Sequence, residues 1–260
     1  MRAFRLAAAA ACLAVLTACG PDDTPAPAAS SPAAAPSSPA AAPASDPPSS
    51  APPSAAVPSV SAGGGKASPL PAVWISPQAV PLESVYHWGT PAKSARGVDE
   101  PVFVFEQVCR GKRPADLPRP MKSATAALGG AQAGDWQADE TVGSWGPATS
   151  SAQAQAAYEF LGGLIAELKD CASTAPGARV EVTTEDAANK LAATLTVPQP
   201  DGTAVQLHEY LTVSGGAVAE LALRAQTAKG AKPRTAWSAP TDDAVLKALA
   251  QPVCTAFKDC

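Results

Sequence analysis

The stretch TAVQLHEYLTVSGGAVAELALRA, residues 203–225, contains two runs of alternating apolar and polar residues around a Ser-Gly-Gly sequence. This alternation predicts two β-strands joined by a tight turn. If both strands bury the same face, Val213 lies opposite Ala217 and the three intervening residues form the loop. A two-residue loop would instead place Leu211 opposite Glu220, so the pattern favours the longer turn.

Two more alternating segments precede this pair. ARVEVTT (178–184) and KLAATLTV (190–197) predict two strands. The same pairing logic places Leu195 opposite Val205. The segments therefore predict an antiparallel meander in which the 203–213 strand lies between its neighbours.

Two segments have apolar residues at helical spacing. Residues 152–171 carry one apolar stripe, formed by Ala157, Leu161, Leu164, Ile165, Leu168 and Cys171. In residues 241–257, Thr241 is a suitable helix cap, and Pro252 is expected to break or kink the helix near its end.

Two further strands are predicted upstream. The segment PVFVFEQV (101–108) is rich in β-branched and aromatic residues, and DWQADETVGSW (135–145) places Trp136, Ala138 and Val142 on one face. The predicted order along the chain is strands, a helix, four strands and a second helix. This order predicts an α+β fold, with an antiparallel sheet and both main helices packed on one face.

The stretch LAVLTACG (13–20) ends an apolar run that follows two arginines. The run is shorter than the ~20 residues that a permanent span needs, and the pattern is typical of an export signal. Its end, Leu16–Cys19, resembles a bacterial lipobox, in which the cysteine is acylated and the signal is removed. The sequence therefore predicts a signal peptide over 1–18 and a lipid on Cys19, which would anchor the protein to membrane lipid on the extracytoplasmic face of the cell membrane. The alternative is an ordinary secretory signal.

Composition divides the remaining chain into a linker and one domain. Residues 19–70 are mostly Ala, Pro and Ser, which favours a disordered linker because no core can form. Residues 71–260 contain all five Trp, both His and the last four Cys, and they suffice for one domain. The net charge of −4 and the scattered basic residues argue against nucleic acid as a partner. No motif calls for a cofactor.

The domain contains four cysteines, which an oxidising compartment would join in two disulfides. They are Cys109, Cys171, Cys254 and Cys260. Four cysteines allow three pairings. We favour Cys109–Cys171 with Cys254–Cys260, for which a fold-back of the chain end after Pro252 is needed.

The order of elements and cysteines resembles a known family. The chain is similar to the PknH-like extracellular sensor domain in four successive features. These are a strand ending near Trp145, a helix of the form A-x-A-A-Y-x-F-L…L-K-D-C, a meander and a last helix with Cys254. This domain occurs outside some serine/threonine kinases and in actinobacterial lipoproteins. The resemblance implies a ligand-sensing module with an exposed cleft and without catalysis. Here Cys171 stands alone after the helix and no kinase domain is present, so the family's disulfide pattern is not carried over.

Motifs for catalysis or metal binding are missing from the sequence. The chain has two histidines, His87 and His208, neither in a recognisable motif, and VGSWG (142–146) lacks the first glycine of G-x-S-x-G. We therefore expect no catalytic residues and no metal site.

Trp74 and Trp88 could stack on a sugar, although tryptophans more often fill a core. The leading hypothesis is a non-enzymatic binding or sensor-like module for an unknown envelope ligand or protein; the alternative is an envelope hydrolase with an unrecognised site.

One acidic residue interrupts an apolar strand face. Glu209 lies among Leu207, Leu211 and their apolar neighbours, where an ionised carboxylate is costly. It either lines a cleft and meets a donor of the ligand, or it reaches water at a bulge or an uncovered face. Glu209 is therefore the candidate ligand-binding residue.

Overall fold

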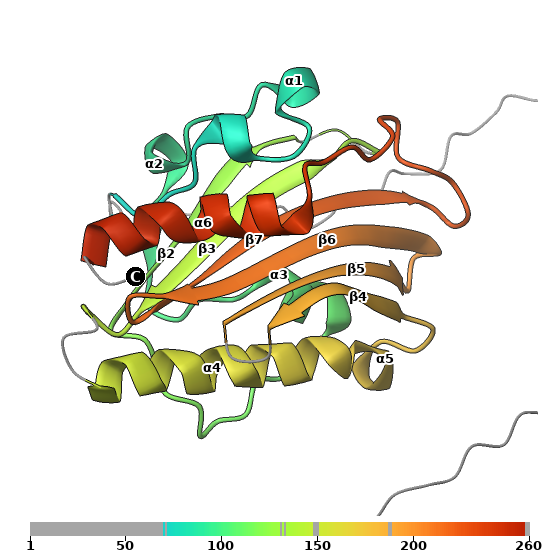
Figure 1. Cartoon of the computed structure of the whole chain (residues 1–260). Coiled ribbons are helices and arrows are strands. Elements are labelled where there is room, and N and C mark those ends of the chain that lie inside the picture. The colour runs from blue at the N-terminus through green and yellow to red at the C-terminus, as the bar shows by residue number, and fades with distance from the viewer. Residues whose placement is uncertain are drawn as a thin grey trace, which may run out of the picture. The chain divides into compact units, whose positions relative to one another are not determined.

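Seven antiparallel strands form one sheet in the order β1-β2-β3-β7-β6-β5-β4 in the computed structural model of this chain (Figure 1). The structure describes residues 70, 72–130, 132, 134–147, 151–186 and 189–257. The predicted signal peptide, Cys19, most of the predicted linker and Cys260 lie outside these residues. The strands are β1 (Arg96–Val98), β2 (Lys122–Gly129), β3 (Gln137–Ser144), β4 (Arg179–Asp186), β5 (Lys190–Pro198), β6 (Thr203–Ser214) and β7 (Ala217–Ala228).

The helices surround this sheet, and the predicted α+β class is confirmed. They are α1 (Glu83–Tyr86), α2 (Pro91–Ser94), α3 (Val104–Cys109), α4 (Ser151–Lys169), α5 (Cys171–Thr174) and α6 (Asp242–Phe257), with a 3₁₀ turn at Pro77–Ala79. The predicted stripe of α4 is buried throughout. None of the described helices is both long and apolar enough to cross a lipid bilayer.

The predicted meander is confirmed, because β4, β5, β6 and β7 are consecutive neighbours in the sheet. Between β5 and β6, Leu195 lies opposite Leu207 and Val197 opposite Val205. This register differs by two residues from the predicted one. Because side chains alternate with a period of two, each residue still lies on the predicted face.

The turn between β6 and β7 is shorter than predicted. Ser214 pairs with Ala217, which leaves only Gly215 and Gly216 in the loop. Their φ angles are 54° and 69°, and a turn with two positive φ values matches the right-handed twist of the strands and favours glycine. The prediction of a three-residue loop is therefore wrong. Shortening the loop by one residue moves the apolar side chains of β7 to the opposite face of the sheet.

The two main helices consequently cover opposite faces, as Figure 1 shows, and the prediction that both pack on one face is wrong. On what we call the α6 face, α6 and residues 70–95 pack against Leu221, Leu223 and Trp136. On the α4 face, α3 and α4 pack against Leu207, Leu211 and their neighbours on β5 and β6. The physical reason is that both faces of β7 are buried along most of the strand, so each face needs its own cover.

The predicted strand over 101–108 is also wrong, because the chain forms a loop and then the short helix α3. The Glu106 carboxylate accepts from the N–H of Phe103 at 2.7 Å, as in a capping box. The N–H of Val104 donates to Glu220 at 2.6 Å. Two carboxylates thus satisfy the helix start, where negative charge is favourable, and the aromatic residues fill the core instead of pairing in the sheet.

Helix α6 does not end at Pro252 but continues to Phe257. Its buried stripe includes Leu249 before the proline and Val253 after it. Packing on both sides of Pro252 therefore holds the last turn, although proline removes a backbone hydrogen bond there. This continuation brings the end of α6 over the start of β2 and the end of β3.

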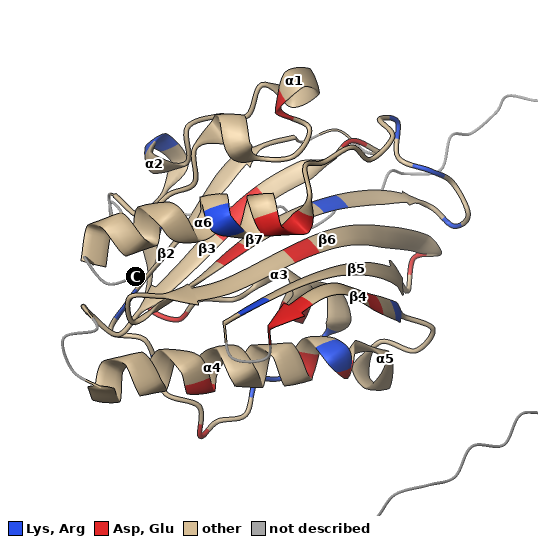
Figure 2. Cartoon of the chain, in the orientation of Figure 1, with Lys and Arg blue, Asp and Glu red and all other residues tan. Residues whose placement is uncertain are grey.

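Charged residues are distributed unevenly between surface and interior. Figure 2 shows Lys and Arg scattered over separate elements, whereas several acidic residues lie on the inner strands β3, β6 and β7. Three of these carboxylates are fully buried: Glu140, Glu209 and Glu220.

Candidate functional site

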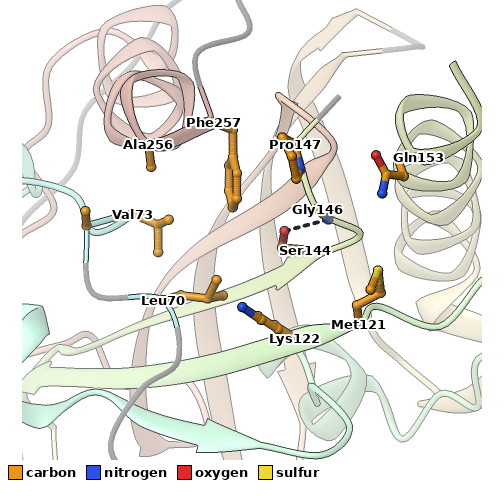
Figure 3. A pocket seen from close by; sticks show the side chains of 11 residues that line it. Leu70, Val73, Met121, Lys122, Ser144, Gly146, Pro147, Gln153, Ala256 and Phe257 are labelled. Atoms are coloured by element: carbon orange, nitrogen blue, oxygen red, sulfur yellow. Dashed lines mark hydrogen bonds between the residues drawn. The ribbon is translucent and has the colours of Figure 1, made fainter. Parts of the chain in front are cut away.

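A pocket of about 430 Å³ opens at the end of the sheet where β2 begins and β3 ends (Figure 3). Its size lies within the ~300–1,000 Å³ that small-molecule sites occupy. Most of its wall is apolar, and these residues come from three separate segments: Leu70, Ala72, Val73, Met121, Ala256 and Phe257. The pocket is therefore assembled only when the first and last described residues meet over the sheet.

Backbone contacts fix the floor of this pocket. The N–H of Met121 donates to the carbonyl of Ser144 at 2.8 Å, which joins the two strand ends. Gly146 has a φ of 103°, and a Cβ there would come within 3.0 Å of the Gln153 amide. The chain thus turns sharply toward the start of α4, and glycine permits the close approach.

Three polar side chains line the pocket: Lys122, Ser144 and Gln153. The Ser144 hydroxyl oxygen accepts from the N–H of Gly146 at 3.1 Å. Among the described residues no acceptor takes the hydroxyl proton of Ser144, and no carboxylate pairs with Lys122. Figure 3 shows the Lys122 side chain extending across the pocket toward Leu70. The lining therefore carries one positive charge, no negative charge and one hydroxyl donor.

Glu209 is not part of this pocket but lies buried on the α4 face. Its exposed fraction is 0%, so the alternative in which it reaches water is wrong. The sheet register places Ala193 and Ala222 on either side of it. Its ligand-binding role stays a prediction.

Glu209 belongs to what we call the buried carboxyl cluster, formed by the carboxyl groups of Glu106, Glu167, Glu209 and Glu220, with Arg113 beside Glu106 and Glu167. Arg113 makes two hydrogen bonds to Glu106, at 2.8 and 2.6 Å, and lies over the rings of Phe103 and Phe160. The guanidinium neutralises Glu106 in a bidentate pair. The other carboxyl groups of the cluster are left without a basic partner at ion-pair distance in the described part of the chain.

The carboxyl groups of Glu209 and Glu220 face each other. No described N–H or O–H group donates to either oxygen of Glu209. Burial raises the pKa of Glu209 well above its usual value, and the charges of Glu220 and Glu106 raise it further. Burial also raises the pKa of Glu220 to about 8. Two carboxylates cannot form a hydrogen bond without a proton, so the pair holds one at neutral pH.

Glu140 is a separate buried carboxylate on the α6 face. Its two oxygens accept from the N–H of Ile75 at 3.0 and 3.2 Å. Burial raises the pKa of Glu140 to about 8, although the Ile75 hydrogen bond lowers it. Glu140 thus holds Ile75 against the sheet, two residues after Val73 of the pocket wall.

The two histidines are not arranged as general bases. His208 stacks on Trp237 with ring centres 3.5 Å apart, and burial lowers the pKa of His208 to about 4. His87 ends the short helix α1 with a φ of 49°. Neither side chain hydrogen-bonds to a hydroxyl or a carboxylate among the described residues. His208 is partly buried.

The tryptophans mostly fill the core. Trp74, Trp88, Trp136 and Trp145 are at most 8% exposed, and none of them lines the pocket. The sugar-stacking alternative for Trp74 and Trp88 is therefore not supported, because their faces are covered. Among the described residues no group of three His, Cys, Asp or Glu is placed to hold a metal ion.

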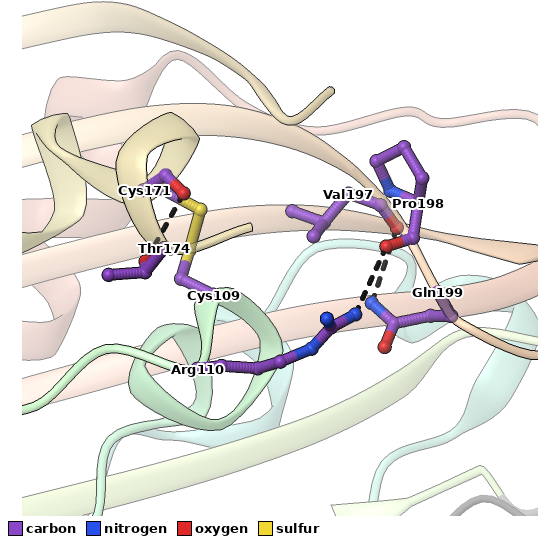
Figure 4. The surroundings of a disulfide bond; sticks show 7 residues. All are labelled: Cys109, Arg110, Cys171, Thr174, Val197, Pro198 and Gln199. Atoms are coloured by element: carbon purple, nitrogen blue, oxygen red, sulfur yellow. Dashed lines mark hydrogen bonds between the residues drawn. A yellow bond between two sulfur atoms is a disulfide. The ribbon is translucent and has the colours of Figure 1, made fainter. Parts of the chain in front are cut away.

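A disulfide joins the end of α3 to the start of α5. Cys109 and Cys171 are fully buried and bonded, as Figure 4 shows, which confirms this predicted pair. Nearby, Arg110 donates to the carbonyl of Pro198 at 3.4 Å, so this region also contacts the end of β5. Cys254 is also disulfide-bonded, but its expected partner Cys260 lies outside the described residues, and that pairing stays a prediction.

Comparisons with known protein families, with curated proteins and with solved structures find no match to this chain. The candidate site therefore rests on its own geometry. The sequence did not predict the pocket because its lining comes from five segments with no common motif. Val73 and Phe257, for example, are 184 positions apart in the sequence.

Proposed function

We propose that this chain is a lipid-anchored, extracytoplasmic protein whose α+β domain binds a ligand without catalysing a reaction, as its resemblance to the PknH-like sensor domain suggests. The observation that carries the proposal is the open pocket between residues 70–73, β2 and the end of α6. A largely apolar concave site with a few convergent polar groups is typical of small-molecule binding.

The alternative, an envelope hydrolase, has less support. A hydrolase needs a nucleophile and a base in hydrogen-bonding reach of each other and of the substrate. His208 is stacked on Trp237 with a lowered pKa. Glu209 and Glu220 face each other but are fully buried. A substrate would have to open the core to reach them.

Filling the pocket is expected to abolish binding. Ala256 lies at its wall on the last turn of α6 and is exposed, so Ala256→Trp adds an indole to the pocket without disturbing the core. In a thermal-shift screen of wall fragments, lipids and sugars, a ligand at a hundredfold excess over Kd should stabilise the wild type by about 2.7 kcal/mol. This corresponds to roughly 5–10 °C in Tm, and the Ala256→Trp variant should show no such shift.

Ala244→Trp is the matched control, because Ala244 is exposed near the start of the same helix and does not line the pocket. This variant should respond like the wild type. A compound that shifts both tryptophan variants equally binds elsewhere, and a screen without any hit would overturn the proposed binding function.

The lipid anchor has its own test. Growth with labelled palmitate should mark the wild-type chain and leave the Cys19→Ser chain unlabelled, because acylation needs the thiol nucleophile. Label on the serine variant would contradict the assignment of Cys19.

A further inference from the structure

The lining of the pocket restricts the class of ligand beyond its apolar character. Lys122 is its charged residue, and no acidic residue lines it. A bound cation would be repelled by Lys122, and a ligand rich in hydroxyl groups would leave most of them without partners against the apolar wall. The lining therefore favours a molecule with an apolar body and one anionic end.

We infer that the pocket binds a single-chain anionic amphiphile, namely a long-chain fatty acid with its carboxylate at Lys122 and Ser144 and its chain against Leu70, Val73 and Phe257. This inference rests on the proposed binding function. It specifies the ligand of the same site.

The polar end of the pocket suits a carboxylate. Lys122 is the first residue of β2 and Ser144 the last of β3, and the two are directly paired in the sheet. An ammonium group and a hydroxyl on paired residues of neighbouring strands can approach the same carboxylate oxygens. The Ser144 oxygen already accepts from Gly146, so its proton remains to donate.

The apolar end of the pocket suits a single chain. Val73 is buried at 2% exposure, whereas Met121 is 74% exposed at the mouth. Unbranched methionine is a flexible, adaptable contact for an acyl chain. The wall also includes Leu70, the last residue of the predicted linker and the first that the structure describes.

The test uses the otherwise full chain with Cys19 replaced by serine, so that its own acyl group does not compete. Palmitate, below its aggregation concentration, and the uncharged alcohol of the same chain length are titrated by calorimetry at pH 8. Lys122→Met keeps an unbranched apolar side chain and removes the charge. It should weaken palmitate binding about tenfold, the worth of one hydrogen-bonded charge, and leave the alcohol unchanged.

Lys247→Met is the matched control, because Lys247 is exposed on α6 and does not line the pocket. It should bind both compounds like the parent chain. If palmitate and the alcohol bind equally and Lys122→Met changes the affinity for neither, the inferred anionic end of the ligand is wrong. The proposal that the pocket binds a ligand would then still hold. If Ala256→Trp leaves palmitate binding intact, the ligand lies elsewhere and the inference is overturned. If neither compound binds, the inference fails, and the screen with the other ligand classes then decides the proposed function.

Discussion

Replacing both Cys109 and Cys171 by alanine is expected to lower the free energy of unfolding by about 4 kcal/mol. The bridge closes a loop over a sequence separation of 62 and so restricts the unfolded chain. For a domain of this size the loss corresponds to a decrease in Tm of roughly 8–16 °C. Urea unfolding at fixed pH, followed by tryptophan fluorescence, measures it. Reduction of the wild type should give a larger loss, because it also opens the disulfide of Cys254.

The second cysteine pair provides the control. If Cys254 is bonded to Cys260, its loop is short, and removing both cysteines should cost only about 2 kcal/mol. Equal losses from the two double variants would contradict the loop-length argument. Peptide mapping without reduction would show directly whether Cys254 and Cys260 are linked.

Glu209→Gln is expected to make the protein more stable in mildly alkaline solution. The side-chain amide can donate to Glu220 and replaces the proton that the carboxyl pair must otherwise hold. At pH 8 the variant should gain about 2–4 kcal/mol, or roughly 5–15 °C in Tm. Near pH 4.5 the two proteins should be nearly equal, because the wild-type pair is then protonated in the folded state without cost.

The sign follows from the raised pKa values. A carboxyl group with a folded pKa above its usual 4.5 holds a proton that the unfolded chain has released. Stability is therefore fully present below about pH 4.5 and falls as pH rises toward about 8, by up to about 1.4 kcal/mol per unit for each such proton. Glu140 and Glu220, with pKa values of about 8, also contribute to this decline in the wild type.

Thermal unfolding from pH 4.5 to 9 measures this dependence. Glu181→Gln is the control, because Glu181 is an exposed glutamate on the edge strand β4. It should follow the wild-type curve, whereas Glu209→Gln should show a shallower slope above pH 5. Identical slopes in all three proteins would contradict the shared proton.

Elements governed by local periodicity could be predicted from the sequence. The α4 stripe from Ala157 to Leu168 is buried as expected, because helical spacing places those residues on one side whatever they pack against. The prediction of a strand over 101–108 was wrong because the composition of this segment fits a buried strand. The start of the helix that forms there instead depends on Glu220, more than a hundred residues away in the sequence.

The candidate site was less predictable than the elements that form it. Glu209 was singled out by its break in the apolar pattern, and its burial gives that break a physical meaning. Its partner Glu220 interrupts no apolar face of β7, and the sheet places it opposite Leu211. The pocket had no signal, because Leu70, Lys122 and Phe257 become neighbours only through the tertiary fold.

The sequence by itself determined the α+β class, the meander of β4 to β7 and the two main helices, which follow from the period of the apolar residues. It favoured the Cys109–Cys171 pair among three possible pairings, and the structure selects that pair. The tertiary structure alone decided the two-residue Gly215–Gly216 turn and, with it, the placing of α4 and α6 on opposite faces. Alternation fixes register only when one face of a sheet is buried and the other is wet. Both faces of β7 are buried, and Glu220 and Arg224 lie on the face toward α4, so matching the apolar faces of β6 and β7 gives the wrong register. The geometry of the turn together with the two covering helices selects the observed one.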